Sequence, residues 1–234
     1  MRVGCVFGKM SYMDAVILAA GKGTRLRPIT DTMPKGMVDV CGRPLIKRII
    51  DALPPVDRLI IVVGYLGDQI IDYVQANVWK IPVTFVKQER LDGTGSALYL
   101  VREHLSERFL VVNGDDLYAA DDLKRLTKHD LAVLAREANS RPLATVERRA
   151  DSSMSGIVPA GELGPWLQVC GAYMLDQRFF DYPLVEIPVR DSREYSLPHT
   201  IAKMAQDHTV NIELASKWLP VGTPEELEKA RKSC

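Results

Sequence analysis

The stretch Leu18-Ala-Ala-Gly-Lys-Gly-Thr-Arg-Leu-Arg-Pro-Ile-Thr-Asp-Thr-Met-Pro-Lys35 decides the fold of this chain. It follows the apolar run Ala15–Leu18, which predicts a buried β-strand that ends in a turn. The glycines allow the backbone to pass close to a ligand, and the unpaired N–H groups of such a turn can face an anion. The same stretch carries cations at Lys22, Arg25, Arg27 and Lys35. Together these features predict a cradle for a triphosphate, although a basic surface loop is the simpler alternative.

Apolar runs and amphipathic stretches alternate after the cradle. Strands are expected near residues 59–63, 83–86 and 109–112, and helices near 42–53, 64–74 and 97–105. Continuous apolar strands are typical of a parallel sheet covered on both faces, whose ligands lie outside the carboxyl ends of the strands. We therefore expect an α/β protein with a three-layer α/β/α, doubly wound, mostly parallel (mixed) sheet. Farther along, helices are expected near 120–138, 197–206 and after Thr223, with a strand near 142–147.

Composition narrows the functional class. The chain has 234 residues, enough for one substantial domain, and its formal net charge is zero. This balance argues against nucleic-acid or membrane partners, and no apolar run approaches the ~20 residues of a membrane span. Met1–Tyr12 lacks an apolar core, so it is expected to be a disordered extension and not a signal peptide. The cysteines are widely spaced, which favours neither zinc nor a disulfide framework and predicts a reduced, cytoplasmic protein.

Two candidate ligand positions follow predicted strands. The amide of Gln88 offers donors and acceptors that suit the edge of a nucleobase, although a helix-entry loop capped by Thr94 or Ser96 is an alternative. Asp115 follows the strand at 109–112 and is placed to reach the ligand crevice, where Mg²⁺ accepts carboxylate oxygens. The alternative is that Asp115 and Asp116 cap the next helix.

The longer pattern Leu-Ala-Ala-Gly-x-Gly-Thr-Arg-Leu-x-Pro-x-Thr, followed by Pro34-Lys35, closely resembles the N-terminal motif of the sugar-1-phosphate nucleotidylyltransferases. Looser matches extend over nearly the whole chain from Met13. The resemblance implies a Rossmann-like nucleotidyltransferase (GT-A-like) fold in a single domain over 13–234. The nucleotide would bind to the half at 13–118 and the sugar phosphate to the half at 119–234. With no hexapeptide repeat visible, the chain resembles a minimal catalytic domain, and a homo-oligomer is one option.

The resemblance also implies an activity: the phosphate of a sugar 1-phosphate attacks the α-phosphorus of a nucleoside triphosphate, and pyrophosphate leaves. Arg25 and Lys35 match the catalytic cations, and Asp115 matches the residue that binds Mg²⁺. The implied nucleotide contacts are Ala19, Ala20, Gly21, Gly23, Thr24, Gln88, Gly93 and Thr94. The implied sugar-phosphate contacts are Gly156, Glu162 and Lys217.

The chain departs from the family pattern in its second half. Ser155 stands where an aromatic residue is usual, and a shortened Glu162-Leu-Gly-Pro165 replaces Glu-Lys-Pro. Pro220 stands where the family places a second metal-binding carboxylate. The ion would then depend on Asp115, water and phosphates, or on Asp116 as a substitute. Two other activities stay open: cytidylyl transfer to a small phosphorylated alcohol such as phosphocholine, marked by an aromatic or acidic cage, and a catalytically weak binding or regulatory relative.

Overall fold

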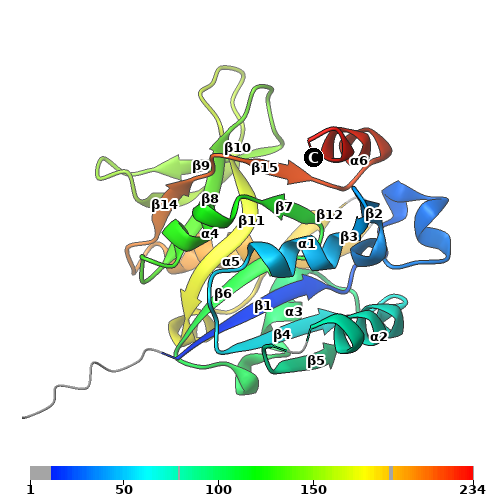
Figure 1. Cartoon of the computed structure of the whole chain (residues 1–234). Helices are drawn as coiled ribbons and strands as arrows, with labels where there is room; N and C mark the ends of the chain where they lie inside the picture. The colour runs from blue at the N-terminus through cyan, green and yellow to red at the C-terminus, as the bar shows by residue number, and fades with distance from the viewer. Residues whose placement is uncertain (1–11, 79, 190–191, 234) are drawn as a thin grey trace, which may run out of the picture.

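The computed structural model describes residues 12–78, 80–189 and 192–233. Within these ranges seven strands form the central sheet, in the order β14-β8-β11-β6-β1-β4-β5 (Figure 1). Strands β6, β1, β4 and β5 run parallel to one another, whereas β11 is antiparallel to both β6 and β8. The predicted mostly parallel, mixed sheet is therefore confirmed.

The strands of the central sheet are β1 (Met13–Ala19), β4 (Arg58–Val63), β5 (Val83–Lys87), β6 (Arg108–Asn113), β8 (Ala132–Glu137), β11 (Leu167–Asp176) and β14 (Asn211–Leu214). Smaller pairs are formed by β2 (Asp39–Val40) with β3 (Arg43–Pro44), β7 (Asp116–Tyr118) with β15 (Trp218–Pro220), β9 (Ala144–Arg148) with β10 (Met154–Pro159), and β12 (Val185–Val189) with β13 (Ser192–Ser196). The α-helices are α1 (Leu45–Ala52), α2 (Gly67–Asn77), α3 (Thr94–Tyr99), α4 (Ala120–Leu126), α5 (Leu197–Met204) and α6 (Pro224–Arg231).

The sheet separates two apolar cores, which gives the predicted three layers. Alternate residues of β1 point to opposite faces, so that Ala15 and Ile17 enter one core and Val16 and Leu18 the other. Helices α1, α2, α4 and α6 contribute to the first core, and α3 and α5 to the second (Figure 1). Burial on both faces explains why β1, β4 and β6 are continuous apolar runs.

The prediction of one long helix near 120–138 is wrong. Only Ala120–Leu126 is helical (α4), and after a turn Ala132–Glu137 becomes β8, the second strand from the β14 edge of the central sheet. Its first four residues are buried between β11 and β14. Alanine and leucine favour helices, so local propensity misled the prediction, and the pairing with two neighbouring strands overrides it. The helix expected near 97–105 begins earlier, at Thr94, and its α-helical part ends at Tyr99.

Three expectations about the chain as a whole have different outcomes. The expected extension at Met1–Tyr12 lies outside the described residues except for Tyr12. Cys41 is disulfide-bonded, whereas the cysteine spacing predicted a reduced protein. The spacing therefore no longer supports the prediction of a reducing compartment. Cys170 is free and buried, and burial raises the pKa of its thiol.

In the described ranges, no helix has the length and apolarity that a bilayer crossing requires.

Candidate functional site

The candidate site lies where the parallel strands end. Strands β1, β4, β5 and β6 finish at Ala19, Val63, Lys87 and Asn113, and the parallel register places these ends along one edge of the sheet. The segments that follow them contain most of the residues expected to bind ligand. In a sheet of this topology the crevice at the carboxyl ends is the usual ligand position.

The cradle after β1 is held by backbone and hydroxyl contacts. Gly23 has φ of 63°, a left-handed conformation that favours glycine, and its carbonyl accepts a hydrogen bond of 2.8 Å from the buried hydroxyl of Thr30. Tyr65 N donates to the carbonyl of Ala20 at 3.1 Å, and Gly64 packs so closely that a Cβ would lie 2.6 Å from that oxygen. The cradle is therefore fixed in shape without a ligand.

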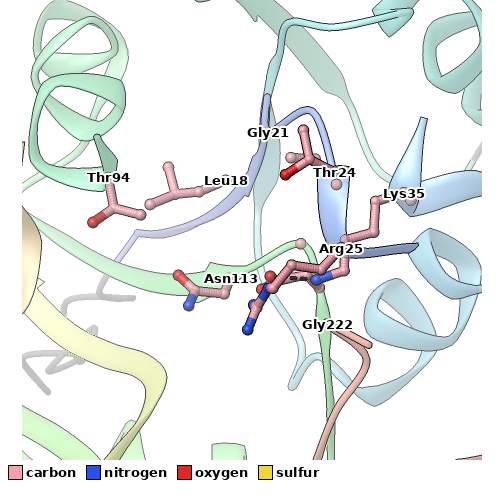
Figure 2. Close-up of a pocket in the computed structure, with 13 residues that line it drawn as sticks. Leu18, Gly21, Thr24, Arg25, Lys35, Thr94, Asn113 and Gly222 are labelled. Carbon is pink, nitrogen blue, oxygen red and sulfur yellow. Dashed lines mark hydrogen bonds and ion pairs between the residues drawn. The ribbon is translucent and has the colours of Figure 1, made fainter. Parts of the chain in front are cut away.

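The cradle opens into what we call the central cavity, of about 260 Å³ (Figure 2). It is lined by Leu18, Ala19, Gly21, Gly23, Thr24, Arg25, Lys35, Gly36, Thr94, Asn113, Gly114, Asp115 and Gly222. In Figure 2 Thr94 and Thr24 stand on opposite sides of Leu18, and the side chains of Arg25 and Asn113 lie below them. The structure thus gathers both predicted catalytic cations and the predicted metal ligand around one space.

Lys35 and Asp115 form an ion pair, with 2.6 Å between Nζ and Oδ2. The Lys35 side chain is 11% exposed and that of Asp115 is 40% exposed, so the pair sits at the wall of the cavity. The carbonyl of Asp115 also accepts a 3.0 Å hydrogen bond from Val221 N, which fixes the loop after β6 against the segment after β15. Both charges are therefore fixed in place before a ligand arrives.

Arg25 packs against Gly222 at the start of the C-terminal segment. A Cβ on Gly222 would lie 2.7 Å from a terminal guanidinium nitrogen of Arg25 and 2.9 Å from Glu226 Oε2. Glu226 in turn accepts a 2.7 Å hydrogen bond from Gly222 N, as part of the cap of α6. Arg27, in contrast, is exposed and pairs with Asp31 at 3.0 Å, outside the cavities. Of these two arginines, only Arg25 faces the central cavity.

A second space, the glutamine cavity, adjoins the first. It is lined by Leu18, Ala20, Gly21, Lys22, Gly23, Thr24, Gln88, Leu91, Gly93, Thr94, Ala97 and Glu194. The Gln88 amide nitrogen donates to Gly93 O at 3.1 Å and to Ser96 Oγ at 3.0 Å, so the side chain orders its own loop, and no described residue donates a hydrogen bond to its amide oxygen. Gly93 has φ of 117° and lies against Tyr195 O, where a Cβ would be 2.3 Å away. All eight predicted nucleotide contacts therefore line the central or the glutamine cavity.

A third space, the acidic cavity, lies on the other side of Thr94 and Asn113. It is lined by Thr94, Asn113, Asp116, Gln168, Val169, Gly171, Tyr173, Ile187, Glu194, Tyr195, Ser196, Pro198 and Trp218. Gly171 allows the cavity wall to form, because a Cβ there would lie 2.3 Å from Asn113 Nδ2. The pKa of Tyr173 is raised by burial, so its hydroxyl stays protonated.

Pro220 lies opposite Asp116 in the antiparallel pair of β15 and β7. Burial, and next the neighbouring charge of Asp115, raise the pKa of Asp116 well above its ordinary value. The Tyr118 hydroxyl lies 3.4 Å from Asp116 Oδ2. Asp116 faces the acidic cavity and does not line the central one, so it is poorly placed to replace the missing carboxylate.

The residues that line the central cavity fit a magnesium ion that has few protein ligands. Asp115 is the one carboxylate among the described residues that line the central cavity. The described part of the chain holds no cluster of three or more His, Cys, Asp or Glu suited to a metal. Mg²⁺ keeps several waters and is often held by one or two carboxylates together with substrate phosphates. Asp115 at the edge of a phosphate-sized space therefore meets the minimum requirement.

The predicted sugar-phosphate contacts lie elsewhere. Gly156 is on β10, Glu162 is exposed in the loop after it, and neither lines the three cavities. Lys217 is exposed and its Nζ lies 3.4 Å from Ser233 O. The residues that line the cavities and that sequence reasoning did not select as site residues include Asn113, Glu194 and Trp218. Asn113 could have been predicted from its position, because it ends β6 at the edge of the sheet where ligands bind. Glu194 and Trp218 belong to β13 and β15, and no pattern near them in the sequence indicates that they share a cavity.

Comparisons with known proteins agree with this geometry. Residues 14–234 match the family model described as Nucleotidyl transferase. The chain is 28% identical over 234 residues to the bifunctional protein GlmU of Methanocaldococcus jannaschii, covering 94% of this chain and 54% of that protein. It is 39% identical over 127 residues to the UTP–glucose-1-phosphate uridylyltransferase AglF of Haloferax volcanii, covering 53% and 52%.

A solved structure extends the likeness to the fold. A UDP-glucose pyrophosphorylase complexed with UDP-glucose superposes with a TM-score of 0.81 at 20% identity, over 95% of this chain and 98% of that one. At that identity the likeness concerns the fold alone. The chain spans about half the length of the curated relatives that it matches.

Proposed function

Because the chain belongs to the nucleotidyl transferase family, we propose that it transfers a nucleotidyl group from a nucleoside triphosphate to a sugar 1-phosphate. A phosphate oxygen of the sugar 1-phosphate forms a bond to the α-phosphorus. The bond between that phosphorus and the oxygen that bridges to the β-phosphate breaks, and pyrophosphate leaves with the electron pair. The products are a nucleoside diphosphate sugar and pyrophosphate.

One observation carries this proposal: Arg25, Lys35 and Asp115 surround a single cavity at the carboxyl ends of β1 and β6. Phosphoryl and nucleotidyl transfers depend mainly on positioning and on neutralising charge. The Arg25 guanidinium can form two hydrogen bonds to phosphate oxygens and stabilise the charge on the leaving pyrophosphate. Lys35, which pairs with Asp115, would hold the α-phosphate or the entering phosphate.

The glutamine cavity supplies a place for the base. It shares Leu18, Gly21, Gly23, Thr24 and Thr94 with the central cavity, so a nucleotide can extend from one into the other. Gln88 would bind the base edge through its free oxygen, and the backbone at Gly93 would approach the base closely. These contacts can serve more than one base.

Asp115 would hold the Mg²⁺ ion, which supplies charge neutralisation between the phosphates when it is bound. The other residues of the site act without it. The glycine backbone of the cradle donates N–H groups to phosphate oxygens, and Thr24 and Thr94 close the space from two sides.

Release of pyrophosphate from four nucleoside triphosphates, each paired with a panel of sugar 1-phosphates and Mg²⁺, tests the proposal. We expect release that requires both substrates and that yields a nucleoside diphosphate sugar detectable by mass spectrometry. A folded protein that binds nucleotide but releases no pyrophosphate with any pair would support the binding or regulatory alternative and contradict an enzymatic role.

A further inference from the structure

The nitrogen of the Gln88 amide is surrounded by hydrogen-bond acceptors of its own loop. Gln88 is 5% exposed. Its amide nitrogen lies 3.1 Å from Gly93 O, 3.0 Å from Ser96 Oγ and 3.4 Å from Asp92 Oδ1. A backbone carbonyl and a carboxylate accept hydrogen bonds and do not donate them. The amide oxygen therefore cannot exchange places with the nitrogen without facing the same acceptors.

Ser96 also acts as an acceptor toward Gln88, because its proton is used elsewhere. The Ser96 hydroxyl donates to Asp92 Oδ1 and lies 3.1 Å from Gly93 O. A hydroxyl has one proton to donate, and a carboxylate is a stronger acceptor than a neutral carbonyl. The proton therefore goes to Asp92, and the Ser96 oxygen accepts from the Gln88 amide. A chain of hydrogen bonds thus runs from Gln88 through Ser96 to Asp92.

The backbone that carries this chain of hydrogen bonds is fixed at both ends. Gln88 N donates to Val63 O at the end of β4, with a distance of 2.8 Å. Tyr195 N, on β13, donates to Asp92 O at 2.7 Å. Only a rotation of the Gln88 side chain itself could reverse its amide, and the acceptors around the nitrogen oppose that rotation.

The fixed amide offers one kind of group to a ligand. Gln88 lines the glutamine cavity, and no described residue donates a hydrogen bond to its oxygen. That oxygen accepts and does not donate, so the base edge that faces it must donate. Uracil, thymine and guanine carry a protonated ring nitrogen on their pairing edge. In cytosine and adenine the ring nitrogen is unprotonated, and its lone pair would face the Gln88 oxygen.

On the premise of the nucleotidyl transfer proposed above, we infer that Asp92 and Ser96 are positioning residues that hold Gln88 as an acceptor. The site consequently selects a base with a protonated ring nitrogen. Neither residue lines the glutamine cavity, so both act through the Gln88 amide and not through contact with the base. The inference favours UTP, dTTP and GTP as substrates over CTP and ATP.

Matched pairs of nucleotides test the inference. The pairs are UTP against CTP, and GTP against the triphosphate of 2-aminopurine riboside, whose corresponding ring nitrogen is unprotonated. Pyrophosphate release is measured with the sugar 1-phosphate that the acceptor panel selects. In the pair that the wild-type protein uses better, we expect the member with the protonated nitrogen to have a kcat/KM at least about tenfold higher than its partner, mainly through a lower KM.

Variants of the two positioning residues assign this preference to the amide. Asp92→Asn replaces an acceptor by a group that can donate, so the Gln88 amide can reverse, and the kcat/KM ratio should fall about fivefold or more. Glu89→Gln is the matched control, because Glu89 belongs to the same loop, pairs with Lys87 at 3.2 Å and does not line the glutamine cavity. The control should keep the wild-type ratio.

A second pair of variants separates orientation of the amide from general stability of the loop. Ser96→Ala removes the hydroxyl and should lower the ratio about threefold. Ser96→Thr keeps the hydroxyl and should restore the wild-type ratio. Ser96 also lines a mostly apolar groove on the other side of the loop, with Tyr99, Leu100 and Leu184, which leaves room for the added methyl group.

The possible failures are distinct. Equal or better use of CTP and of the 2-aminopurine nucleotide overturns the inference while nucleotidyl transfer stands. A ratio unchanged in Asp92→Asn, or lowered equally in Glu89→Gln, also overturns it. If no nucleotide releases pyrophosphate, the proposed function fails, and calorimetric binding of the same four nucleotides decides the inference. Tighter binding of a protonated member, lost in Asp92→Asn, supports the inference, whereas equal affinity or no binding contradicts it.

Discussion

The central cavity and the acidic cavity share Thr94 and Asn113 but are built in opposite ways. The central cavity draws most of its lining from one stretch, residues 18–36, and its buried lysine has an acidic partner. The acidic cavity takes most of its lining from β7, β11, β13 and β15, and its carboxyl groups form no ion pair with a described residue. Of these two cavities, the central one therefore contains an ion pair between its own lining residues, whereas the described residues of the acidic cavity form none.

This contrast also separates general chemistry from selectivity. A charged cradle that binds phosphates serves any nucleotidyl transfer, so a contiguous motif can encode it. Selectivity for the acceptor depends on side chains that only the tertiary fold brings together. Variants in the central cavity should consequently lower turnover with every acceptor.

The largest effect is expected from Arg25→Ala. Loss of a preorganised charge at the transferring phosphorus should lower kcat at least about a hundredfold, because such groups contribute ~2.7–4 kcal/mol to transition-state stabilisation. Arg27→Ala is the matched control, since Arg27 is exposed, paired with Asp31 and outside the cavities. Pyrophosphate release measures both. Near-normal turnover by a folded Arg25→Ala protein would remove Arg25 from the reaction.

Asp122→Ala should cause the next largest effect, on stability. This fully buried carboxylate accepts hydrogen bonds from Ser216 N at 2.8 Å, Ser216 Oγ at 2.6 Å and Lys217 N at 3.1 Å. It thus anchors the segment that leads into β15, which serves both cavities. Its loss should lower the free energy of unfolding in urea by about 2 kcal/mol. Asp121→Ala, at the exposed neighbouring position, should change it by less than ~0.5 kcal/mol.

The same carboxylate predicts a pH dependence. Burial alone would raise the pKa of Asp122, but hydrogen bonds from Ser216, Lys217 N and Arg125 lower it below its ordinary value. A lowered pKa in the folded state means that this group contributes stability above its unfolded pKa of about 3.9, and that the contribution disappears as pH falls through the folded value. The difference between wild type and Asp122→Ala should therefore shrink below about pH 4. A difference that stayed constant down to pH 2 would contradict this account.

Gly222→Ala should have a smaller effect on turnover. The added Cβ would lie 2.7 Å from the Arg25 guanidinium and should push it out of position. Because misplacement of a catalytic group by about 1 Å can cost up to ~100-fold, we expect a decrease of about tenfold in kcat. Gly161→Ala is the control, since nothing lies within 4 Å of its Cβ position. Equal rates for the two variants would mean that Arg25 is not held by this contact.

The smallest effect is expected from Pro220→Asp, which restores a carboxylate at the position opposite Asp116. A second oxygen ligand should strengthen Mg²⁺ binding, so the Mg²⁺ concentration at half-maximal rate should fall about threefold. Mg²⁺ alone should also raise the melting temperature of the variant more than that of the wild type. The absence of any metal-dependent difference would show that this position does not reach the ion.

The sequence was most informative where function follows local structure. The continuous apolar runs of β1, β4 and β6 predicted parallel strands, and the carboxyl ends of β1, β5 and β6 bring the cradle, Gln88 and Asp115 to one edge of the sheet. The nucleotide contacts expected from the motif all line two adjoining cavities. Each of these features depends on residues that lie close together in the sequence, so a local sequence pattern can reveal it.

Prediction was weakest in the second half of the chain, where contacts between residues far apart in the sequence determine the structure. The residues of β8 look helical in isolation and become a strand because β11 and β14 pair with them. The positions of Glu194 and Trp218 in one cavity depend on a hairpin and a short pair of strands far apart in the chain. No local pattern places a residue across such distances, so the prediction of Glu162 and Lys217 depended on the family resemblance.

The most direct test of the central claim is a crystal structure with Mg²⁺ and an unreactive analogue of the nucleoside triphosphate that the pyrophosphate assay selects. We predict phosphate oxygens within about 3 Å of the Arg25 guanidinium and of Lys35 Nζ, with the ion bound to Asp115 and the Lys35–Asp115 contact lengthened from 2.6 Å. Phosphates bound outside this cavity, with the Lys35–Asp115 pair intact and Arg25 turned away, would contradict the account.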